Sequence, residues 1–376
     1  MPQNNIVPLI HTIGTAIPPF KISQETHHAI LESANGMSRE EKLRMRKIYS
    51  KSGIKYRHSV LDEFDGEDVP QNKIFHPAGD ITTSVSLRMG IYEKYAADLC
   101  KQAVLCCMED LPELKREEIT HVITFSCTGM YAPGLDVELV EKLGLQKNVE
   151  RTCINFMGCY AGINALKNAY HTARSQPDAV ILLAGVELCS LHYQKSNEQD
   201  QVIANALFSD GAAAAIVSAR NFNKKEKKPA LALQHFYTEF DNAGITDMVW
   251  RIGDFGFDLR LSPDVPHVVQ DNIAALVQKL LEKADLTQAE IDHYAIHPGG
   301  MKILEACEQA LGLSHEQNEI SYNILSEYGN MSSVTILFVL QAYIQNLSNT
   351  DKGQKILACA FGPGLTMESM IVETVI

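Results

Sequence analysis

The distribution of apolar residues predicts strands that alternate with helices. Short, almost continuously apolar runs occupy residues 121–125, 153–156, 179–184, 294–296 and 356–360, a pattern typical of buried strands. Helical spacing of apolar residues is found instead at 92–107, 265–284 and 301–311. This alternation predicts layers of helices packed on sheets, an α/β fold, rather than an all-α or all-β body.

A weak internal repeat indicates that the α/β unit is duplicated. EITHV, from residue 118, returns as EIDHY; VEKLGL, from residue 140, returns as EQALGL; GCYAGINALKNAY, from residue 158, corresponds to GNMSSVTILFVLQAY. The three segments recur in one order, about 170 residues apart. A pseudo-twofold axis would place Cys159 and Asn330 at matching helix starts that face one central site.

The repeat predicts two halves, residues 1–222 and 223–376. The sequence contains no low-complexity stretch or Pro/Gly linker that would separate independent domains. The basic run NKKEKKP at 223–229 is therefore interpreted as a surface loop between the halves.

Cys159 is the first residue with reactive chemistry. It follows the strand-like RTCINF and a short turn, and it begins a segment of helical composition. A helix N-terminus favours a thiolate through its macrodipole and free N–H groups, so we expect a pKa below the ordinary value of about 8.5. The alternative is a small buried residue at a point where Gly158 lets a strand approach a helix.

His297 and Asn330 are the candidate partners of this thiol. His297 ends the run HYAIHPGG, where Pro298 and two glycines terminate a strand, and ligands gather at the carboxyl ends of strands in α/β sheets. Asn330 precedes an apolar helix, where an N-cap is the ordinary role, but its correspondence to Cys159 favours catalysis. The three residues provide a nucleophile for a thioester and two neutral donors for an oxyanion or enolate. Because no comparably placed carboxylate offers a strong base, a carbon nucleophile is expected to form by loss of CO₂.

Three further features have structural explanations as ordinary as their functional ones. FGPG at 361–364 either brings backbone close to the site or forms a tight turn. Phe208, in ALFSDGAAAA, is by itself a core residue. A basic stretch that contains Arg44, Lys47 and Lys51 would suit the phosphates of CoA, or it forms a solvated helix face.

Composition narrows the classes of function. A chain of 376 residues with 45% apolar and 21% charged residues is typical of soluble globular proteins, and a net charge of −13 argues against general nucleic-acid binding. The amino-terminal segment lacks a secretory signal, and no apolar run approaches the roughly 20 residues of a membrane span. Nine scattered cysteines fit neither a disulfide framework nor a zinc site, so we expect a cytoplasmic protein whose cysteines are mostly buried apolar residues.

In combination and order, GCYAG, ALFSDGAAAA, IHPGG, EYGNMSS and FGPGLTME resemble the chalcone synthase-like type III polyketide synthases, particularly the bacterial ones, over nearly the whole chain. The resemblance implies a thiolase-like five-layer αβαβα fold, a homodimer, and an acyltransferase with no cofactor beyond its CoA thioester substrates. Such an enzyme condenses malonyl-CoA repeatedly onto an acyl-CoA or malonyl-derived starter and cyclises the chain to an aromatic or pyrone product.

The resemblance also implies roles for individual residues. Cys159 would hold the starter and the growing chain, and His297 would help to keep it ionised. His297 and Asn330 would stabilise the thioester carbonyl during decarboxylation, and Phe208 would be the gatekeeper that crowds the malonyl carboxylate. Further positions implied by the motifs are Ser332, Gly362, Pro363 and Gly364 for substrate, and Arg44, Lys47 and Lys51 for CoA.

Departures from the plant pattern make chalcone formation doubtful. Leu259 stands at the second gatekeeper position, Trp250 at a glycine, and Ala132 where a residue crosses the dimer interface; Cys127, Cys189 and His192 stand at cavity threonines. The segment VELCSLHYQ is similar to that of bacterial enzymes that make small aromatic polyketides from malonyl-CoA alone. Alkylresorcinol and alkylpyrone synthases share much of this pattern.

Three other hypotheses stay open. A ketoacyl-ACP synthase III-like enzyme uses a similar Cys-His-Asn set for one condensation, although FGPGL and EYGNMSS favour the polyketide interpretation. A cysteine hydrolase can have these residues in the same order, but the CGSCW-type signature is absent around Cys159. A non-catalytic relative would be expected to lack one of the three residues, and all three are present.

Overall fold

The structure is a computed structural model that describes residues 6–34, 36–62, 84–194, 198–222, 229–348 and 350–375. Residues 223–228, which hold most of the predicted basic surface loop, lie outside this part of the chain.

Within the described residues, nine strands form one continuous sheet in the order β11-β12-β13-β8-β1-β7-β6-β4-β5. All five predicted strands overlap members of this sheet. The strands are β1 (Leu9–Ala16), β4 (His121–Ser126), β5 (Glu150–Asn155), β6 (Val180–Leu188), β7 (Asp210–Ser218), β8 (Ala230–Phe240), β11 (His293–Ile296), β12 (Lys355–Gly362) and β13 (Thr366–Val375). Two smaller sheets pair β2 (Phe20–Ser23) with β3 (Tyr56–Ser59), and β9 (Met248–Ile252) with β10 (Phe257–Leu261).

The strand order is symmetric about the contact between β8 and β1. These two strands meet through only two residue pairs, Leu9 with Ala232 and Ile10 with Leu231. On one side, β1 pairs antiparallel with β7, β7 antiparallel with β6, and β6 parallel with β4. On the other side, β8–β13, β13–β12 and β12–β11 repeat these orientations. The matching order confirms the internal duplication.

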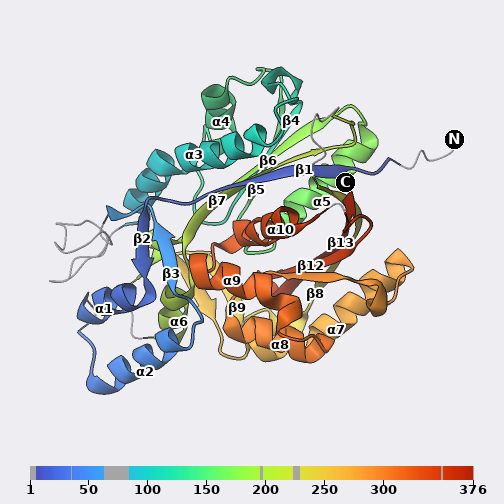
Figure 1. The fold of residues 1–376 in the computed structure, drawn as a ribbon. Coiled ribbons are helices and arrows are strands. Elements are labelled where there is room, and N and C mark those ends of the chain that lie inside the picture. Colours follow the sequence, from blue (N-terminus) through green and yellow to red (C-terminus); the bar gives the residue numbers. More distant parts are fainter. Residues whose placement is uncertain are drawn as a thin grey trace.

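Helices lie in three layers on and between the two halves of the sheet (Figure 1). The outer layers contain α3 (Val85–Glu109) with α4 (Leu135–Leu143), and α7 (Val265–Ala284) with α8 (Met301–Leu311); α5 (Ala161–Ser175) and α10 (Thr335–Asn346) lie between the half-sheets. The remaining helices are α1 (Gln24–Ala34), α2 (Arg39–Ser50), α6 (Gln199–Leu207) and α9 (Glu319–Tyr328).

Alternation along the strands produces these layers. Val180 and Leu182 of β6 join the core around α3, whereas Ile181 and Leu183 join the core around α5 and α10. β12 divides its side chains in the same way between the middle core and the core of α7 and α8. Each half-sheet is therefore buried on both faces, which gives the five-layer αβαβα thiolase-like arrangement.

Matching glycines end the corresponding helices of the two halves. Gly144 follows α4 with φ 65°, and Gly312 follows α8 with φ 67°. This left-handed conformation is the usual helix C-cap, and glycine adopts it without steric cost. The Gly-Leu dipeptide that recurs in the sequence therefore marks the C-terminus of a helix in each half.

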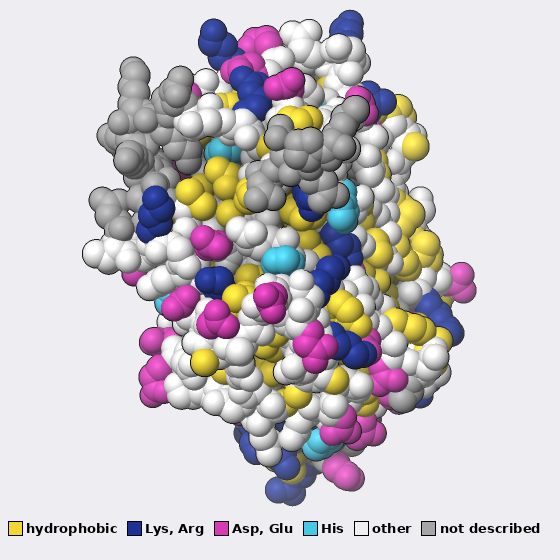
Figure 2. Space-filling model, turned by 90° about the vertical axis from the view of Figure 1, so that its right-hand side faces the viewer, with side chains coloured by type: hydrophobic (Ala, Val, Ile, Leu, Met, Phe, Trp, Pro, Cys, Tyr) yellow, Lys and Arg dark blue, Asp and Glu magenta, His cyan; other side chains and the backbone are white. Residues whose placement is uncertain are grey.

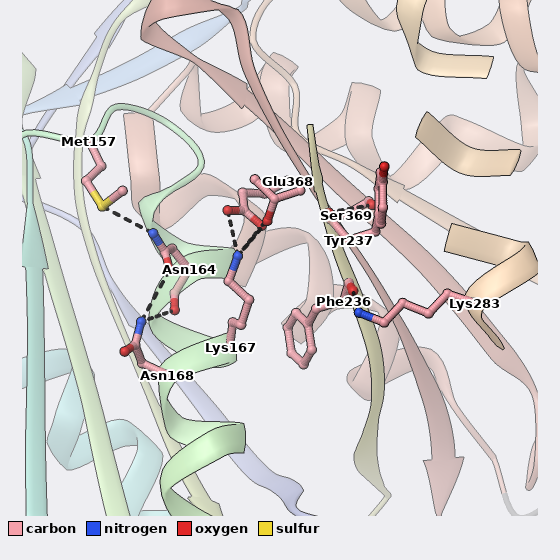
Figure 3. Close-up of polar contacts among 10 residues, drawn as sticks. Met157, Asn164, Lys167, Asn168, Phe236, Tyr237, Lys283, Glu368 and Ser369 are labelled. Carbon is pink, nitrogen blue, oxygen red and sulfur yellow. Dashed lines mark hydrogen bonds and ion pairs between the residues drawn. The ribbon is translucent and has the colours of Figure 1, made fainter. Parts of the chain in front are cut away.

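An ion pair ties α5 to the carboxy-terminal half (Figure 3). The Lys167 Nζ on α5 lies 2.7 Å from both carboxylate oxygens of Glu368 on β13, and it donates to the Thr238 Oγ1 on β8 over 2.7 Å. The Glu368 side chain is only 3% exposed, so its charge depends on the lysine for compensation. Because α5 begins beside Cys159, the pair fixes the helix that follows the candidate nucleophile.

The face shown in Figure 2 carries charged side chains of both signs. Positive and negative side chains are interspersed on the face shown in Figure 2, rather than gathered into a single basic band. Among the helices of the described residues, none combines the length and apolarity needed to cross a bilayer.

The ion pair leads to a prediction about stability. Lys167→Met leaves the Glu368 carboxylate buried and unpaired, and we expect the free energy of unfolding to fall by roughly 3 kcal/mol, measured by urea denaturation. Lys142→Met removes the more exposed pair with Asp98 and is the matched control, with an expected loss below about 1 kcal/mol. Equal losses in the two variants would contradict the structural importance of the Lys167–Glu368 pair.

Candidate active site

A cavity of about 430 Å³ gathers most of the predicted site residues. It brings together residues from both halves of the chain and from α2, α6 and the β9–β10 hairpin. The predicted residues that line it are Cys159, His297, Asn330, Phe208, Ser332, Cys127, Cys189, His192, Trp250, Leu259, Pro363, Arg44, Lys47 and Lys51.

Cys159 lies in a tight loop between β5 and α5. Phe156 and Gly158 have positive φ angles of 63° and 89°, and the N–H of Ala161 donates to the carbonyl of Gly158 over 3.0 Å. Cys159 is thereby held just before the first turn of α5, as the sequence predicts. Its Sγ lies 3.7 Å from the Ser332 Oγ.

The FGPG segment packs against this loop. A Cβ atom on Gly158 would overlap the Pro363 Cδ, and a Cβ on Gly362 would overlap the ring of Tyr160. Pro363 lines the cavity, but Gly362 and Gly364 are not among the described lining residues. The two glycines therefore act on the site through the backbone, because Gly362 permits the close approach and Gly364 adopts a φ of 75°.

His297 is held at the carboxyl end of β11, where the sequence predicts a ligand-binding strand end. Its backbone N–H donates to the carbonyl of Cys359 over 2.8 Å, which continues the pairing of β11 with β12. The side chain is buried and lines the cavity, yet neither ring nitrogen has a hydrogen-bond partner among the described residues. Buried polar groups are nearly always paired, so these nitrogens are available for a bound substrate.

Asn330 is fixed by its backbone to the segment that carries Phe208. The N–H of Asn330 donates to the carbonyl of Leu207, and the N–H of Ser209 donates to the carbonyl of Asn330, each over 2.9 Å. The Asn330 Oδ1 accepts from the N–H of Ser332 over 2.8 Å, and Nδ2 donates to the carbonyl of Gly299 over 3.2 Å. An amide nitrogen has two hydrogens, so the second can be donated to the Cys159 sulfur or to a ligand. Asn330 is not the N-cap that the sequence allows, because that position belongs to Met331 for the turn Ser332–Val334 and to Val334 for α10.

The ionisation of the thiol differs from the expectation. Burial raises the pKa of Cys159 to about 12, although hydrogen bonds from Ser332 and Asn330 oppose the rise. Burial also lowers the pKa of His297 to about 3. The predicted lowering of the thiol pKa by the helix end is therefore wrong, because desolvation outweighs it. Burial thus favours the uncharged form of both groups.

The β9–β10 hairpin forms one wall of the cavity. Leu259 lies directly opposite Trp250 in the strand register, and both side chains line the cavity. The Trp250 Nε1 donates to the carbonyl of Cys127 over 2.8 Å, which ties the hairpin to the end of β4. Trp250 thus has a fixed orientation in the wall and takes up cavity volume, as its position at a plant glycine predicts.

His192 is a fixed part of the same wall. Its Nε2 donates to the carbonyl of Thr128 over 2.6 Å, and its Nδ1 accepts from the N–H of Phe257 over 3.1 Å, so both nitrogens are used. Its ring stacks on that of Phe257, with centroids 4.1 Å apart. Burial lowers the pKa of His192 to about 3, which keeps it neutral. The sequence reasoning missed Phe257, since its position in the hairpin carries no motif.

Exposed basic residues line the same cavity. Arg44, Lys47 and Lys51 come from α2 and the residue that follows it, and Lys302 comes from the start of α8. Lys47, Lys51 and Lys302 form no ion pair with another described residue, as is suitable for an anionic ligand. Lys302, which follows IHPGGM, was not predicted from the sequence.

Arg57 belongs to the same basic stretch but has a different role. It is buried, and its guanidinium donates to the carbonyls of Asn205 and Phe208 over 2.8 Å and to that of Ala206 over 2.6 Å. It therefore satisfies the carbonyls at the end of α6 and holds the backbone of Phe208.

Glu187 is a buried carboxylate that the sequence reasoning missed. Both its oxygens accept from the N–H of Cys127, and it also accepts from the hydroxyls of Thr128 and Ser333. Burial raises its pKa, and these hydrogen bonds oppose the rise. It joins the ends of β4 and β6 to the turn before α10 and does not line the cavity.

Comparison with known families decides the assignment. The model "Chalcone and stilbene synthases, N-terminal domain" matches residues 4–221, and the corresponding C-terminal domain matches residues 230–376. The chain belongs to the chalcone and stilbene synthase family. It is thus a type III polyketide synthase, an acyltransferase that condenses acyl units, with the thiolase-like fold.

Relatives in the chalcone and stilbene synthase family come from distant organisms. "Alpha-pyrone synthesis polyketide synthase-like Pks18" of Mycobacterium tuberculosis is 31% identical over 333 residues, 88% of this chain and 82% of that protein. "Probable polyketide synthase 1" of Dictyostelium discoideum is 31% identical over 97% of this chain, which spans only 11% of that protein. "Type III polyketide synthase C" of Arabidopsis thaliana is 29% identical over 96% of this chain and 94% of its own length.

Solved structures of the chalcone and stilbene synthase family have the same fold. A polyketide synthase, PKS-I, of the brown alga Ectocarpus siliculosus matches with a TM-score of 0.92 and 28% identity over 100% of both chains. The C-terminal type III polyketide synthase domain of the Dictyostelium type I/III hybrid Steely1 matches with a TM-score of 0.90 and 29% identity, over 98% of this chain and 100% of that one. The assignment favours a condensing synthase over the hydrolase and scaffold hypotheses.

The contact between the two loops leads to a second prediction. Gly158→Ala combines a positive φ with an overlap against Pro363, so we expect a loss of about 3–5 kcal/mol in the free energy of unfolding. Gly144→Ala has a comparable φ of 65° and open space around it, so its loss should be about 1–2 kcal/mol. Thermal and urea denaturation of both variants measure the difference. A Gly158→Ala protein as stable as Gly144→Ala would contradict the packing of FGPG on the nucleophile loop.

Proposed function

We propose that this synthase carries out iterative decarboxylative condensation of malonyl-CoA onto an acyl-CoA or malonyl-derived starter held on Cys159, followed by cyclisation to an aromatic or pyrone product. The observation that carries the proposal is the buried imidazole of His297, which has no hydrogen-bond partner among the described residues and lies in the cavity that also contains the Cys159 thiol and the Asn330 amide. Two neutral donors beside one nucleophile suit thioester chemistry.

The first step is transfer of the starter to Cys159. His297 takes the thiol proton, and the thiolate attacks the carbonyl carbon of the acyl-CoA while CoA leaves as a thiol. Because burial raises the pKa of the thiol to about 12 and lowers that of the imidazole to about 3, the charges form together as a pair. The attraction between thiolate and imidazolium offsets part of the cost of burying them.

The second step is decarboxylation of malonyl-CoA. The thioester carbonyl accepts hydrogen bonds from His297 and from the Asn330 Nδ2, through the hydrogen that is not donated to Gly299, and these donors stabilise the enolate that remains when CO₂ leaves. Phe208 presents an apolar side chain in the same cavity, which favours loss of the charged carboxylate as neutral CO₂. The enolate then attacks the acyl group on Cys159, and repetition lengthens the chain.

The basic mouth of the cavity provides the binding site for CoA. Arg44, Lys47, Lys51 and Lys302 are positioned to pair with its phosphates. Among the described residues, no group of three or more His, Cys, Asp or Glu side chains is placed to hold a metal. No step of the proposed reaction requires a metal or redox cofactor.

The shape of the cavity would decide when the chain cyclises. Trp250, Leu259 and Phe257 narrow it from one side. The name of the mycobacterial relative, which refers to α-pyrone synthesis, supports a pyrone as one of the two product classes.

The proposal also includes the oligomeric state of the protein, its location in the cell and its division into two halves. We infer a homodimer, supported by β5, an edge strand whose side chains at Glu150, Arg151 and Cys153 are exposed. All nine cysteines are free thiols, which suits the reducing cytoplasm. The family matches at 4–221 and 230–376 support the proposed halves 1–222 and 223–376.

Turnover of malonyl-CoA labelled with ¹⁴C tests the reaction. Acetyl-, hexanoyl- and long-chain acyl-CoA are offered separately, and both labelled CO₂ and cyclised products are measured. Multi-unit products are expected with at least one starter, and a product extended by only one unit would instead support the ketoacyl synthase hypothesis. Failure to release CO₂ with any starter would contradict the mechanism.

Two variants separate the steps. Cys159→Ala should make no polyketide yet still release CO₂, because decarboxylation uses His297 and Asn330 rather than the thiol. Asn330→Ala should reduce CO₂ release by roughly 10²–10³, the usual effect of removing one oxyanion donor. Unchanged CO₂ release in Asn330→Ala would contradict the assigned role of its amide.

The proposed thiolate–imidazolium pair of Cys159 and His297 leads to a prediction about pH. In the wild type, His297 accepts the Cys159 proton, so the imidazole should lower the pH midpoint at which iodoacetamide alkylates this thiol. In His297→Gln no imidazole accepts the proton, so the midpoint should rise and alkylation at pH 8 should fall more than about tenfold, read on the Cys159 peptide by mass spectrometry. His192→Gln is the matched control and should leave the midpoint unchanged. A midpoint that does not move in His297→Gln would contradict the pairing.

A further inference from the structure

Three neighbouring parallel strands each lead to a cysteine that lines the cavity. β5, β4 and β6 are adjacent in the sheet, and they are followed by Cys159, Cys127 and Cys189 respectively. The proposed condensation uses only the thiol of Cys159. The other two thiols therefore lie in an enzyme cavity without an assigned role in the reaction.

Cys127 is in direct contact with the peptide that precedes Cys159. The N–H of Gly158 donates to the Cys127 Sγ over 2.9 Å, and the same sulfur lies 3.4 Å from the carbonyl oxygen of Gly158. That oxygen shares a peptide plane with the Cα of Cys159, so the Cys127 sulfur lies within about 6 Å of that Cα. Disulfide-bonded cysteines have Cα atoms about 4.4–6.8 Å apart, and the bond would require the Cys159 side chain to turn from the Ser332 hydroxyl toward Cys127.

The charge of one thiol also affects the pKa of the other. Burial raises the pKa of Cys127, and the negative charges of Glu187 and of an ionised Cys159 add to this rise. In the proposed reaction Cys159 ionises with His297, whereas burial and the Glu187 carboxylate disfavour ionisation of Cys127. This difference assigns the roles of a pair, because the thiolate is the form that peroxides oxidise and a second nearby thiol can resolve the product.

We infer that Cys127 and Cys159 form a reversible oxidation site, at which hydrogen peroxide or another hydroperoxide converts the two cavity thiols into one disulfide. The loss of activity that this implies rests on the proposed function of Cys159, whereas formation of the disulfide does not.

The chemistry takes place in two balanced steps. The Cys159 thiolate attacks one oxygen of hydrogen peroxide, the O–O bond breaks, and the products are a sulfenic acid and, after protonation, water. The Cys127 sulfur then attacks the sulfenic sulfur, the S–S bond forms, and the hydroxyl leaves as water with the proton of the thiol. One peroxide is reduced by two electrons, and the two thiols are oxidised to a disulfide. A dithiol reductant reverses the change.

The function of the pair follows from this chemistry. A sulfenic acid without a resolving thiol is oxidised further to sulfinic acid, which thiol reductants do not reverse. The disulfide with Cys127 would therefore protect Cys159 from irreversible oxidation. While the disulfide is present, Cys159 cannot carry an acyl group, so condensation would stop.

Peptide mapping of the full-length enzyme tests this inference. Reduced and desalted protein is treated with hydrogen peroxide, quenched with an alkylating reagent and digested without reductant. We expect a peptide pair that links Cys127 to Cys159, and recovery of most of the activity after treatment with a dithiol. Cys127→Ser and Cys127→Ala should lack the link, accumulate sulfinic acid at Cys159, and recover at least about tenfold less of their own untreated activity.

Cys189→Ser is the matched control, because Cys189 lines the same cavity without a hydrogen bond to Gly158. It should form the Cys127–Cys159 link as the wild type does. Sulfinic acid at Cys159 without a link in the wild type, a link between Cys127 and Cys189 instead, or equal recovery in Cys127→Ser would each overturn the inference. The mapping requires no turnover, so a linked peptide in a protein that makes no polyketide would refute the proposed function and leave the oxidation site standing.

Discussion

The burial of an uncharged thiol beside an uncharged imidazole is the constraint on which the rest of the site depends. Desolvation disfavours the charged forms of Cys159 and His297, and in the proposed reaction the proton passes from one to the other inside the cavity. The charged groups around the site are arranged accordingly. The Glu187 carboxylate is held behind the wall by the Cys127 N–H and by the hydroxyls of Thr128 and Ser333, and the exposed cations line the cavity, where the proposed CoA phosphates can reach them.

The two copies of the α/β unit together enclose the cavity that contains Cys159 and His297. The amino-terminal half contributes Cys159 at the start of α5, and the carboxy-terminal half contributes His297 and Asn330. Contacts between the halves fix the geometry: Gly158 packs on Pro363, the backbone of Asn330 bonds to the Phe208 segment, and Lys167 pairs with Glu368. Each is a close polar or steric contact between segments far apart in the sequence.

Much of this architecture could be predicted from the sequence, for identifiable reasons. Helices 265–284 and 301–311 carry clear periodicity and cap residues, and the structure has them at those bounds. The repeat predicted the symmetric strand order, and the motifs carried the family resemblance. The ionisation of Cys159 could not be predicted, because it depends on burial by residues distant in the chain. Three other features also depend on tertiary packing and have no signature in the local sequence. They are the stacking of Phe257 on His192, the position of Lys302 and the burial of Arg57.

Direct detection of the acyl-enzyme tests the central claim, that Cys159 is the residue that carries the substrate. The enzyme is incubated with each acyl-CoA starter in the absence of malonyl-CoA, quenched in acid, and mapped by mass spectrometry. The account predicts an acyl group on the Cys159 peptide, formed more slowly in His297→Gln and absent from Cys159→Ala. An acyl group found on Cys127 or Cys189 instead, with Cys159 unmodified under conditions in which polyketide forms, would contradict it.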